Sequence, residues 1–276
     1  SRKFIEKTGI EVPGEALYLE DMAGFISKTK KIRAYAALRL MPARMIIRRF
    51  NLDRIRPDDP ATIIYSSGST GAPKGITLTH ANILSNVAAL SELFEQTSDE
   101  CFLGVLPFFH SFGWTGTFWY PLLRGSRAVY HPNPMDTRTI GKLAKQYKAT
   151  FMVATPTFCR MYLRQIPAEA FSSLKYVLVG AERLRPELGR ELEDTYTVTV
   201  LEGYGATECS PVVAVNVPDV RAPGTRQRGK KSGSVGRAIP GVAVKIVDPE
   251  TRQELGIGQE GLLLVSGSNV MRGYWN

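Results

Sequence analysis

One short stretch, residues 63 to 75, combines the residue types that bind polyphosphates in proteins. Ile63 and Ile64 predict a buried strand, and a loop rich in glycine and hydroxyl residues follows. Glycine lets backbone N–H groups approach an anion closely, hydroxyls add donors, and Lys74 supplies a positive charge. The spacing is not that of a Walker loop, because Pro73 occupies the position of its second glycine. Rather than a flexible solvated loop, we predict a phosphate-binding loop formed by Ser66, Ser67, Gly68, Ser69, Thr70, Gly71 and Lys74.

A second candidate segment, Gly203 to Glu208, follows a predicted strand at Val198 to Leu201. In open α/β sheets, ligands bind beyond the carboxyl ends of the strands. There, the ring of Tyr204 can stack on a purine, the hydroxyl of Thr207 can bond a phosphoryl oxygen, and Glu208 offers an oxygen ligand to Mg²⁺. Taken alone, this segment is more simply explained as a turn with an exposed glutamate.

Two more segments carry candidate residues. Residues 180 to 182 (Gly-Ala-Glu) also follow a predicted strand, and Leu106 to Trp114 is dense in aromatic residues around His110. Phe112 and Trp114 suit an acyl-chain pocket as well as they suit a plain core. Core packing around a hydrogen-bonded histidine is the alternative interpretation of this segment.

His131 and Asp136 have the H-x4-D spacing that glycerolipid acyltransferases use, with the histidine as base. Pro132 and Pro134 interrupt the pair, so we assign it no catalytic role. An acyltransferase would require the two side chains to face each other in an open pocket.

Strands and helices that must position these residues alternate along the chain. Strands are expected at 61–65, 101–106, 128–130, 150–154, 174–179 and 198–201, and helices at 79–94, 137–147, 157–164 and 186–195. This order predicts an α/β fold with a doubly wound, mostly parallel sheet. After about Pro211, short strands between turns predict a small antiparallel β subdomain. The expected organisation is a basic lead-in over 1–57, an α/β core over 58–210 and a β-rich subdomain over 211–276.

The net charge of +9 is concentrated in one part of the chain. Residues 28–56 hold ten Lys and Arg against Asp53 alone, and the remainder is neutral. Basic residues interleaved with apolar ones predict an anionic partner, with a solvated linker helix as the alternative. Pro42 should break any helix through this stretch. The three cysteines show no metal spacing, which favours a reducing, cytoplasmic compartment.

Both loop segments resemble the core signatures of the adenylate-forming superfamily of acyl-CoA synthetases, peptide adenylation domains and luciferases. Tyr65 to Gly75 matches Tyr/Phe-Thr/Ser-Ser-Gly-Ser/Thr-Thr-Gly-x-Pro-Lys-Gly at every fixed position, and Gly203 to Glu208 matches Gly-Tyr-Gly-x-Thr-Glu. The resemblance implies the adenylate-forming large domain, with ATP and Mg²⁺ as cofactors. It also implies activation of a fatty-acid carboxylate as acyl-adenylate, followed by transfer to the thiol of CoA or of an acyl carrier protein.

Roles for single residues follow from the resemblance. Lys74, Thr207 and Glu208 would be catalytic, with Thr207 at the α-phosphate and Glu208 holding Mg²⁺. Adenine would be framed by Gly180, Ala181, Glu182, Gly203, Tyr204 and Gly205. His110 would border the substrate carboxylate, beside Phe112 and Trp114.

A closer resemblance rests on Leu106 to Gly113 and on the basic lead-in. These look most like the synthetase portion of bacterial bifunctional acyl-ACP synthetase/2-acylglycerophosphoethanolamine acyltransferases. Residues 28–56 would then contact acyl carrier protein or an anionic inner membrane, and no nucleic acid. Gly261 to Trp275 resembles a further family stretch, in which Leu262 replaces the usual Glu. The family's mobile C-terminal domain is expected to be absent, so we expect a fragment that binds ATP weakly and turns over poorly.

Overall fold

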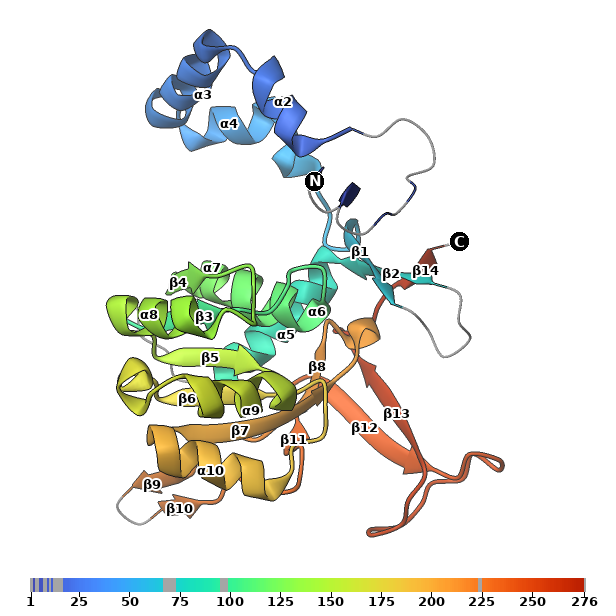
Figure 1. Ribbon diagram of the computed structural model, residues 1–276. Helices are drawn as coiled ribbons and strands as arrows, with labels where there is room; N and C mark the ends of the chain where they lie inside the picture. Colours follow the sequence, from blue (N-terminus) through green and yellow to red (C-terminus); the bar gives the residue numbers. More distant parts are fainter. Residues whose placement is uncertain are drawn as a thin grey trace. The chain divides into compact units, whose positions relative to one another are not determined.

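The computed structural model describes residues 17–66, 73–94, 99–222 and 225–275, together with Arg2, Ile5, Glu6, Gly9 and Glu11. Two compact units divide the chain, residues 1–56 and residues 57–276. The first unit contains α2 (Leu19–Phe25), α3 (Lys28–Leu40), α4 (Ala43–Arg49) and the 3₁₀ turn η1 (Leu52–Arg54) (Figure 1). As predicted, the helix breaks at Pro42, which is the N-cap residue of α4.

A seven-stranded sheet forms the core of the second unit (Figure 1). Its order is β11 (Arg237–Ala238), β8 (Val212–Val215), β7 (Thr199–Gly205), β6 (Tyr176–Val179), β5 (Phe151–Ala154), β3 (Cys101–Gly104), β4 (Arg127–Tyr130). Strands β4, β3, β5, β6 and β7 are parallel, whereas β8 and β11 run antiparallel to their neighbours. The predicted α/β fold with a mostly parallel sheet is therefore confirmed.

Helices cover both faces of this sheet because successive strand residues point to opposite faces and are apolar on both. Met152 and Ala154 of β5 pack with α8 (Thr137–Tyr147), α9 (Pro156–Gln165), the 3₁₀ turn η3 (Ala168–Phe171) and α10 (Pro186–Tyr196). Phe151 and Val153 of the same strand pack with α5 (His80–Leu93) and with a helical run on the opposite face. That run comprises α6 (Ser111–Gly113), the π-helical turn η2 (Trp114–Trp119) and α7 (Tyr120–Arg124).

The predicted helix starts have identifiable caps. Thr79 Oγ1 accepts from the N–H of Asn82 at 3.2 Å, and Asn82 Oδ1 accepts from the N–H of Thr79 at 2.9 Å. This reciprocal capping box starts α5 where the sequence predicted. The helical run over 111–124 was not predicted, because glycine and aromatic residues are weak helix formers. Burial of Phe112 and Tyr120 in the core stabilises it instead.

A separate three-stranded sheet holds the start of the predicted phosphate loop. Strand β1 (Pro60–Ser66) forms an antiparallel hairpin with β2 (Lys74–Thr79), and β14 (Gly273–Trp275) pairs antiparallel with β2. The prediction that the strand at 61–65 begins the mostly parallel sheet was wrong, because β1 lies in this separate antiparallel sheet, and β2 was not predicted. Ile76 and Leu78 alternate on one face of β2 and are fully buried, so packing makes this segment a strand.

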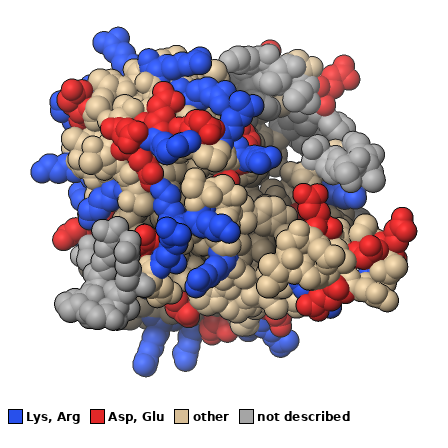
Figure 2. All heavy atoms as spheres, turned by 90° about the horizontal axis from the view of Figure 1, so that it is seen from below, with Lys and Arg blue, Asp and Glu red and all other residues tan. Residues whose placement is uncertain are grey.

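The remaining elements are short. Two antiparallel hairpins are formed by β9 (Val220–Ala222) with β10 (Thr225–Gln227) and by β12 (Val242–Val247) with β13 (Leu262–Gly267), and the 3₁₀ turn η4 spans Thr207–Cys209. On the face shown in Figure 2, Lys and Arg side chains are interspersed with Asp and Glu. Within the described parts of the chain, no helix has the length and apolar character needed to cross a bilayer.

Candidate active site

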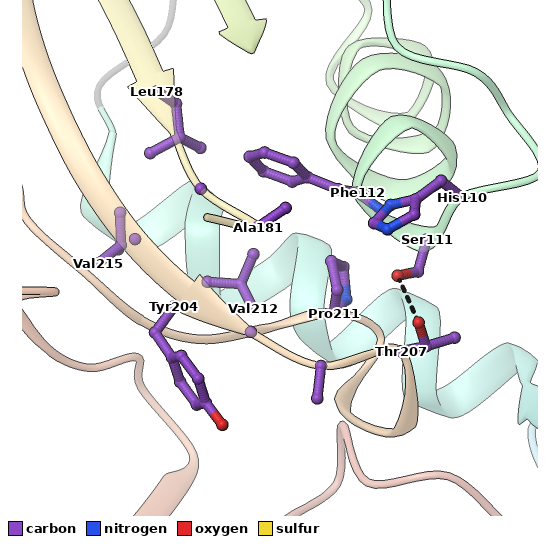
Figure 3. Close-up of a pocket in the computed structure, with 14 residues that line it drawn as sticks. His110, Ser111, Phe112, Leu178, Ala181, Tyr204, Thr207, Pro211, Val212 and Val215 are labelled. Atoms are coloured by element: carbon purple, nitrogen blue, oxygen red, sulfur yellow. Dashed lines mark hydrogen bonds between the residues drawn. The ribbon is translucent and has the colours of Figure 1, made fainter. Parts of the chain in front are cut away.

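A cavity of about 160 Å³ opens where β6 and β7 end (Figure 3). Three separated segments meet there: residues 110–112 at the start of α6, residues 180–181 after β6, and residues 203–207 of β7 and the following turn. The apolar side is completed by Leu178, Pro211, Val212 and Val215. The cavity therefore lies at the carboxyl edge of the sheet, where open α/β folds bind ligands.

Close backbone packing shapes this cavity. A β carbon on Gly205 would lie 2.2 Å from the carbonyl oxygen of Pro211, and one on Gly180 would lie 3.2 Å from the ring of Phe112. Strand β7 continues to Gly205, so residues 203–205 belong to the strand and not to the predicted turn. The ring of Tyr204, 41% exposed, lies at the cavity mouth and points away from Phe112 (Figure 3).

Polar groups converge at one end of the cavity. The hydroxyl groups of Ser111 and Thr207 share a hydrogen bond of 3.2 Å (Figure 3). His110 Nδ1 accepts from the N–H of Phe112 at 3.2 Å, which leaves its Nε2 for another partner. His110 is exposed, but desolvation by the surrounding protein lowers its pKa. A neutral imidazole with Nε2–H as a donor follows at neutral pH.

Glu208, next to Thr207, is held by the segment that enters β14. Its carbonyl oxygen accepts from the N–H of Met271 at 2.7 Å, and its Oε1 accepts from the hydroxyl of Tyr274 at 3.2 Å. Desolvation by burial, and then the charge of Glu208, raises the pKa of Tyr274. The Nζ of Lys74 lies 5.3 Å from the ring centroid of Tyr274. Lys74 and Glu208, from the two predicted loop segments, are therefore linked through one tyrosine.

Two buried amides fix the turn that follows Glu208. Asn86 Nδ2 donates to the carbonyls of Cys209 at 3.3 Å and Val212 at 2.8 Å. Asn269 Nδ2 donates to the same two oxygens, at 3.0 and 3.1 Å. At 0% and 1% exposure, these asparagines tie the turn to α5 and to the segment before β14.

Some predicted residues lie elsewhere or cannot be placed. Ser67, Gly68, Ser69, Thr70 and Gly71 lie outside the described residues, whereas Ser66 pairs with Lys74 across the hairpin.

Glu182 and Trp114 do not line the cavity. Glu182 Oε2 accepts from the hydroxyl of Thr157 at 2.7 Å, which turns it toward α9. Trp114 stacks on Phe118 and lines a separate hollow beside β1. The prediction for Glu182 came from the family resemblance of residues 180–182, and that for Trp114 came from its aromatic ring in the segment around His110.

His131 and Asp136 do face each other, with 3.2 Å between Nε2 and Oδ2. Asp136 is the N-cap residue of α8, and the backbone N–H of Thr139 holds the pKa of this carboxyl below its usual range. The His131 side chain is only 17% exposed. Capping of α8 accounts for Asp136, and we give the pair no catalytic role.

Sequence reasoning missed four polar residues around the site: Ser111, Asn86, Asn269 and Tyr274. Ser111 adjoins His110, and Tyr274 lies in the family-like stretch that ends the chain, so adjacency and resemblance were signals for these two. Asn269 lies in the same family-like stretch, but nothing in the sequence indicated its partners or those of Asn86, which are more than fifty residues away.

Comparison with known proteins places this geometry in one family. The family model described as "AMP-binding enzyme" matches residues 13–275. "Probable 4-coumarate--CoA ligase 3" of Dictyostelium discoideum is 34% identical over 224 residues, which cover 79% of this chain and 39% of that protein. "Long-chain-fatty-acid--CoA ligase" of Bacillus subtilis (strain 168) is 31% identical over 257 residues, which cover 90% of this chain and 43% of that protein.

The fold has solved counterparts as well. The crystal structure of ATP-bound MatB from Rhodopseudomonas palustris superposes with a TM-score of 0.70 at 32% identity, over 80% of this chain and 42% of that one. The chain thus spans about two fifths of the length of these relatives. The match over residues 13–275, on a doubly wound sheet with a cavity at its carboxyl edge, shows that the chain belongs to the AMP-binding enzyme family.

Proposed function

We propose that the cavity between residues 110–112, 180–181 and 203–207 binds Mg·ATP. We also propose that the whole protein uses it to activate a carboxylic acid. The observation that carries the proposal is the meeting of these three segments at one cavity. The relatives named as CoA ligases and the ATP-bound MatB structure support it.

The reaction would be adenylation followed by thioester formation. A carboxylate oxygen attacks the α-phosphorus, the bond to the bridging oxygen breaks, and pyrophosphate leaves. A thiol then attacks the acyl carbonyl, and AMP leaves. Such phosphoryl transfer depends mainly on positioning and charge neutralisation.

The residues at this site have separate tasks in the proposed reaction. Tyr204 and the backbone at Gly180 would frame adenine, and the hydroxyl of Thr207, held by Ser111, would contact the α-phosphate. His110, neutral by its lowered pKa, would donate from Nε2 to a substrate carboxylate oxygen. Lys74 would contact the departing phosphates from β2.

The donor set fits a magnesium ion that is shared with substrate. In the described parts of the chain, no three His, Cys, Asp or Glu side chains gather into a metal site. Mg²⁺ is usually held by one or two carboxylates together with substrate phosphates and water, which one carboxylate, Glu208, can satisfy. When bound, the ion would neutralise phosphate charge.

Replacing Glu208 with Gln tests the proposal. Calorimetry should show weaker binding of Mg·ATP but unchanged binding of AMP without metal, because the lost charge serves the ion. Unchanged Mg·ATP affinity would remove Glu208 from its assigned role. Absence of any nucleotide binding by the unaltered chain would refute the proposed function.

The finer assignments are a fatty-acid substrate, a thiol acceptor that is either CoA or an acyl carrier protein, and a bifunctional acyl-ACP synthetase parent. Their support is the aromatic segment at Leu106 to Gly113 and the relative named as a long-chain-fatty-acid ligase. Pyrophosphate release by the full-length protein should be compared across acids of different chain length and across the two acceptors. The comparison decides which acid and which thiol acceptor the protein uses.

A second candidate function is docking of the first unit on an anionic membrane. On α3, the apolar side chains of Ile32, Tyr35 and Leu38 are 67%, 62% and 69% exposed among basic residues. Apolar contact combined with positive charge is typical of interfacial helices. Sedimentation with vesicles containing anionic lipid tests this candidate; equal binding to neutral vesicles, or competition by acyl carrier protein, would contradict it.

A further inference from the structure

We propose that Tyr274 is a positioning residue for Mg²⁺, because its hydroxyl holds the Glu208 carboxylate beside Lys74. Three contacts carry this inference: the 3.2 Å hydrogen bond from Tyr274 to Glu208 Oε1, the 5.3 Å approach of Lys74 to the tyrosine ring, and the 2.7 Å bond from Met271 to the Glu208 carbonyl. The inference rests on the proposed binding of Mg·ATP.

Strand pairing explains why one tyrosine reaches both groups. Tyr274 pairs with Ile76 across the antiparallel β14–β2 ladder. Lys74 is two residues before Ile76 and therefore projects from the same face of the sheet, as a diagonal neighbour of Tyr274. The ring thus lies beneath the ammonium group, while its hydroxyl extends to the turn at Glu208.

The same segment also fixes the backbone of the metal ligand. Met271 donates to the carbonyl of Glu208, and Arg272 donates to the carbonyl of Thr77 in β2 at 3.1 Å. Residues 271 to 274 therefore bridge the hairpin that carries Lys74 and the turn that carries Glu208. The two signature segments lie far apart in sequence, and this bridge connects them through hydrogen bonds to both.

The hydrogen bond suits metal binding chemically. A carboxylate has two oxygens with several lone pairs, and the tyrosine hydroxyl takes one position on Oε1. Oε2 is left for a cation. Carboxylates that bind metals are commonly held in this way by a second hydrogen bond, and loss of such a partner lowers metal affinity by about 10- to 100-fold.

The test compares Tyr274→Phe with the unaltered chain and with a matched control, Tyr147→Phe. Tyr147 is the last residue of α8, lies far from Tyr274 in the sequence, and has the same 45% exposure. Tyr274→Phe keeps the ring under Lys74 and removes only the hydroxyl. Calorimetric titrations with ATP across a MgCl₂ series, and with AMP in EDTA, are the measurements.

Tyr274→Phe should raise the Mg²⁺ concentration for half-maximal ATP affinity by at least about tenfold, with AMP affinity unchanged. Tyr147→Phe should match the unaltered chain. An unchanged Mg²⁺ dependence in Tyr274→Phe would overturn the inference while leaving the proposed function intact. Equal loss of AMP and Mg·ATP binding would also overturn it, because it would indicate a general structural role. Failure of the unaltered chain to bind nucleotide would instead refute the proposed function.

Discussion

Because the side-chain amides of Asn86 and Asn269 donate to the same two carbonyl oxygens, we predict that removing both will destabilise the protein by more than the sum of the single losses. The shared acceptors are the carbonyls of Cys209 and Val212, at 2.8 to 3.3 Å from the two nitrogens. In either single alanine variant, the other amide still donates to both oxygens. In the double variant, neither oxygen has a side-chain donor.

The structure sets the expected magnitudes. Each alanine replacement removes two donated hydrogen bonds at about 1 kcal/mol each, or roughly 2 kcal/mol per variant. Asn86→Ala also removes the long 3.4 Å bond that Asn86 Oδ1 accepts from the N–H of Val212. The sum for independent sites is about 4 kcal/mol. Leaving buried carbonyls less well paired adds a penalty, so we expect a coupling of about 1–2 kcal/mol in the double variant. The double variant should also bind Mg·ATP more weakly, because the destabilised turn carries Thr207 and Glu208.

Equilibrium urea unfolding, followed by circular dichroism, measures all four members of the cycle. A control cycle pairs Asn86→Ala with Thr150→Ala. Thr150 accepts from the N–H of Cys101 at 2.9 Å, at the opposite edge of the sheet. That pair should be additive within about 0.5 kcal/mol. Additivity of the Asn86 and Asn269 variants as well would refute the reasoning that their acceptors are shared.

Three shorter predictions follow. Gly205→Ala should lower the free energy of unfolding by about 1–3 kcal/mol, because its β carbon would lie 2.2 Å from Pro211 O; an unshifted thermal midpoint would contradict this. His110 has a lowered pKa when folded, so its stability contribution is complete above the unfolded pKa of about 6.5 and is lost as pH falls from there through the folded value. Denaturation at several pH values should show this slope, and His110→Gln should flatten it; an identical slope in the variant would exclude His110 as its source. Thr197 is the C-cap residue of α10 and has a φ of 55°, which glycine adopts without strain. Thr197→Gly should therefore raise the free energy of unfolding, measured in urea, by about 1 kcal/mol. A lower free energy of unfolding would show that the threonine side chain makes a stabilising contact.

Local chemistry determined much of this protein. Apolar runs at residues 151–154 and 176–179 became central parallel strands because they can be buried on both faces. The helix at Thr137–Tyr147 has the bounds that were predicted, and the structure shows that Asp136 caps its start. Residues 180 and 203–207 were each predicted to follow a strand, and in the structure those strands are neighbours with a cavity at their ends.

Tertiary structure alone decided the rest, because its contacts join residues far apart in the chain. Strand β2 forms since Ile76 and Leu78 are buried against partners that no local pattern identifies. Trp114, close to His110 in sequence, lines a different hollow and stacks on Phe118. The bond between Tyr274 and Glu208 spans 66 residues and depends on strand register. Sequence spacing specifies which groups are available, but register and packing determine which of them meet.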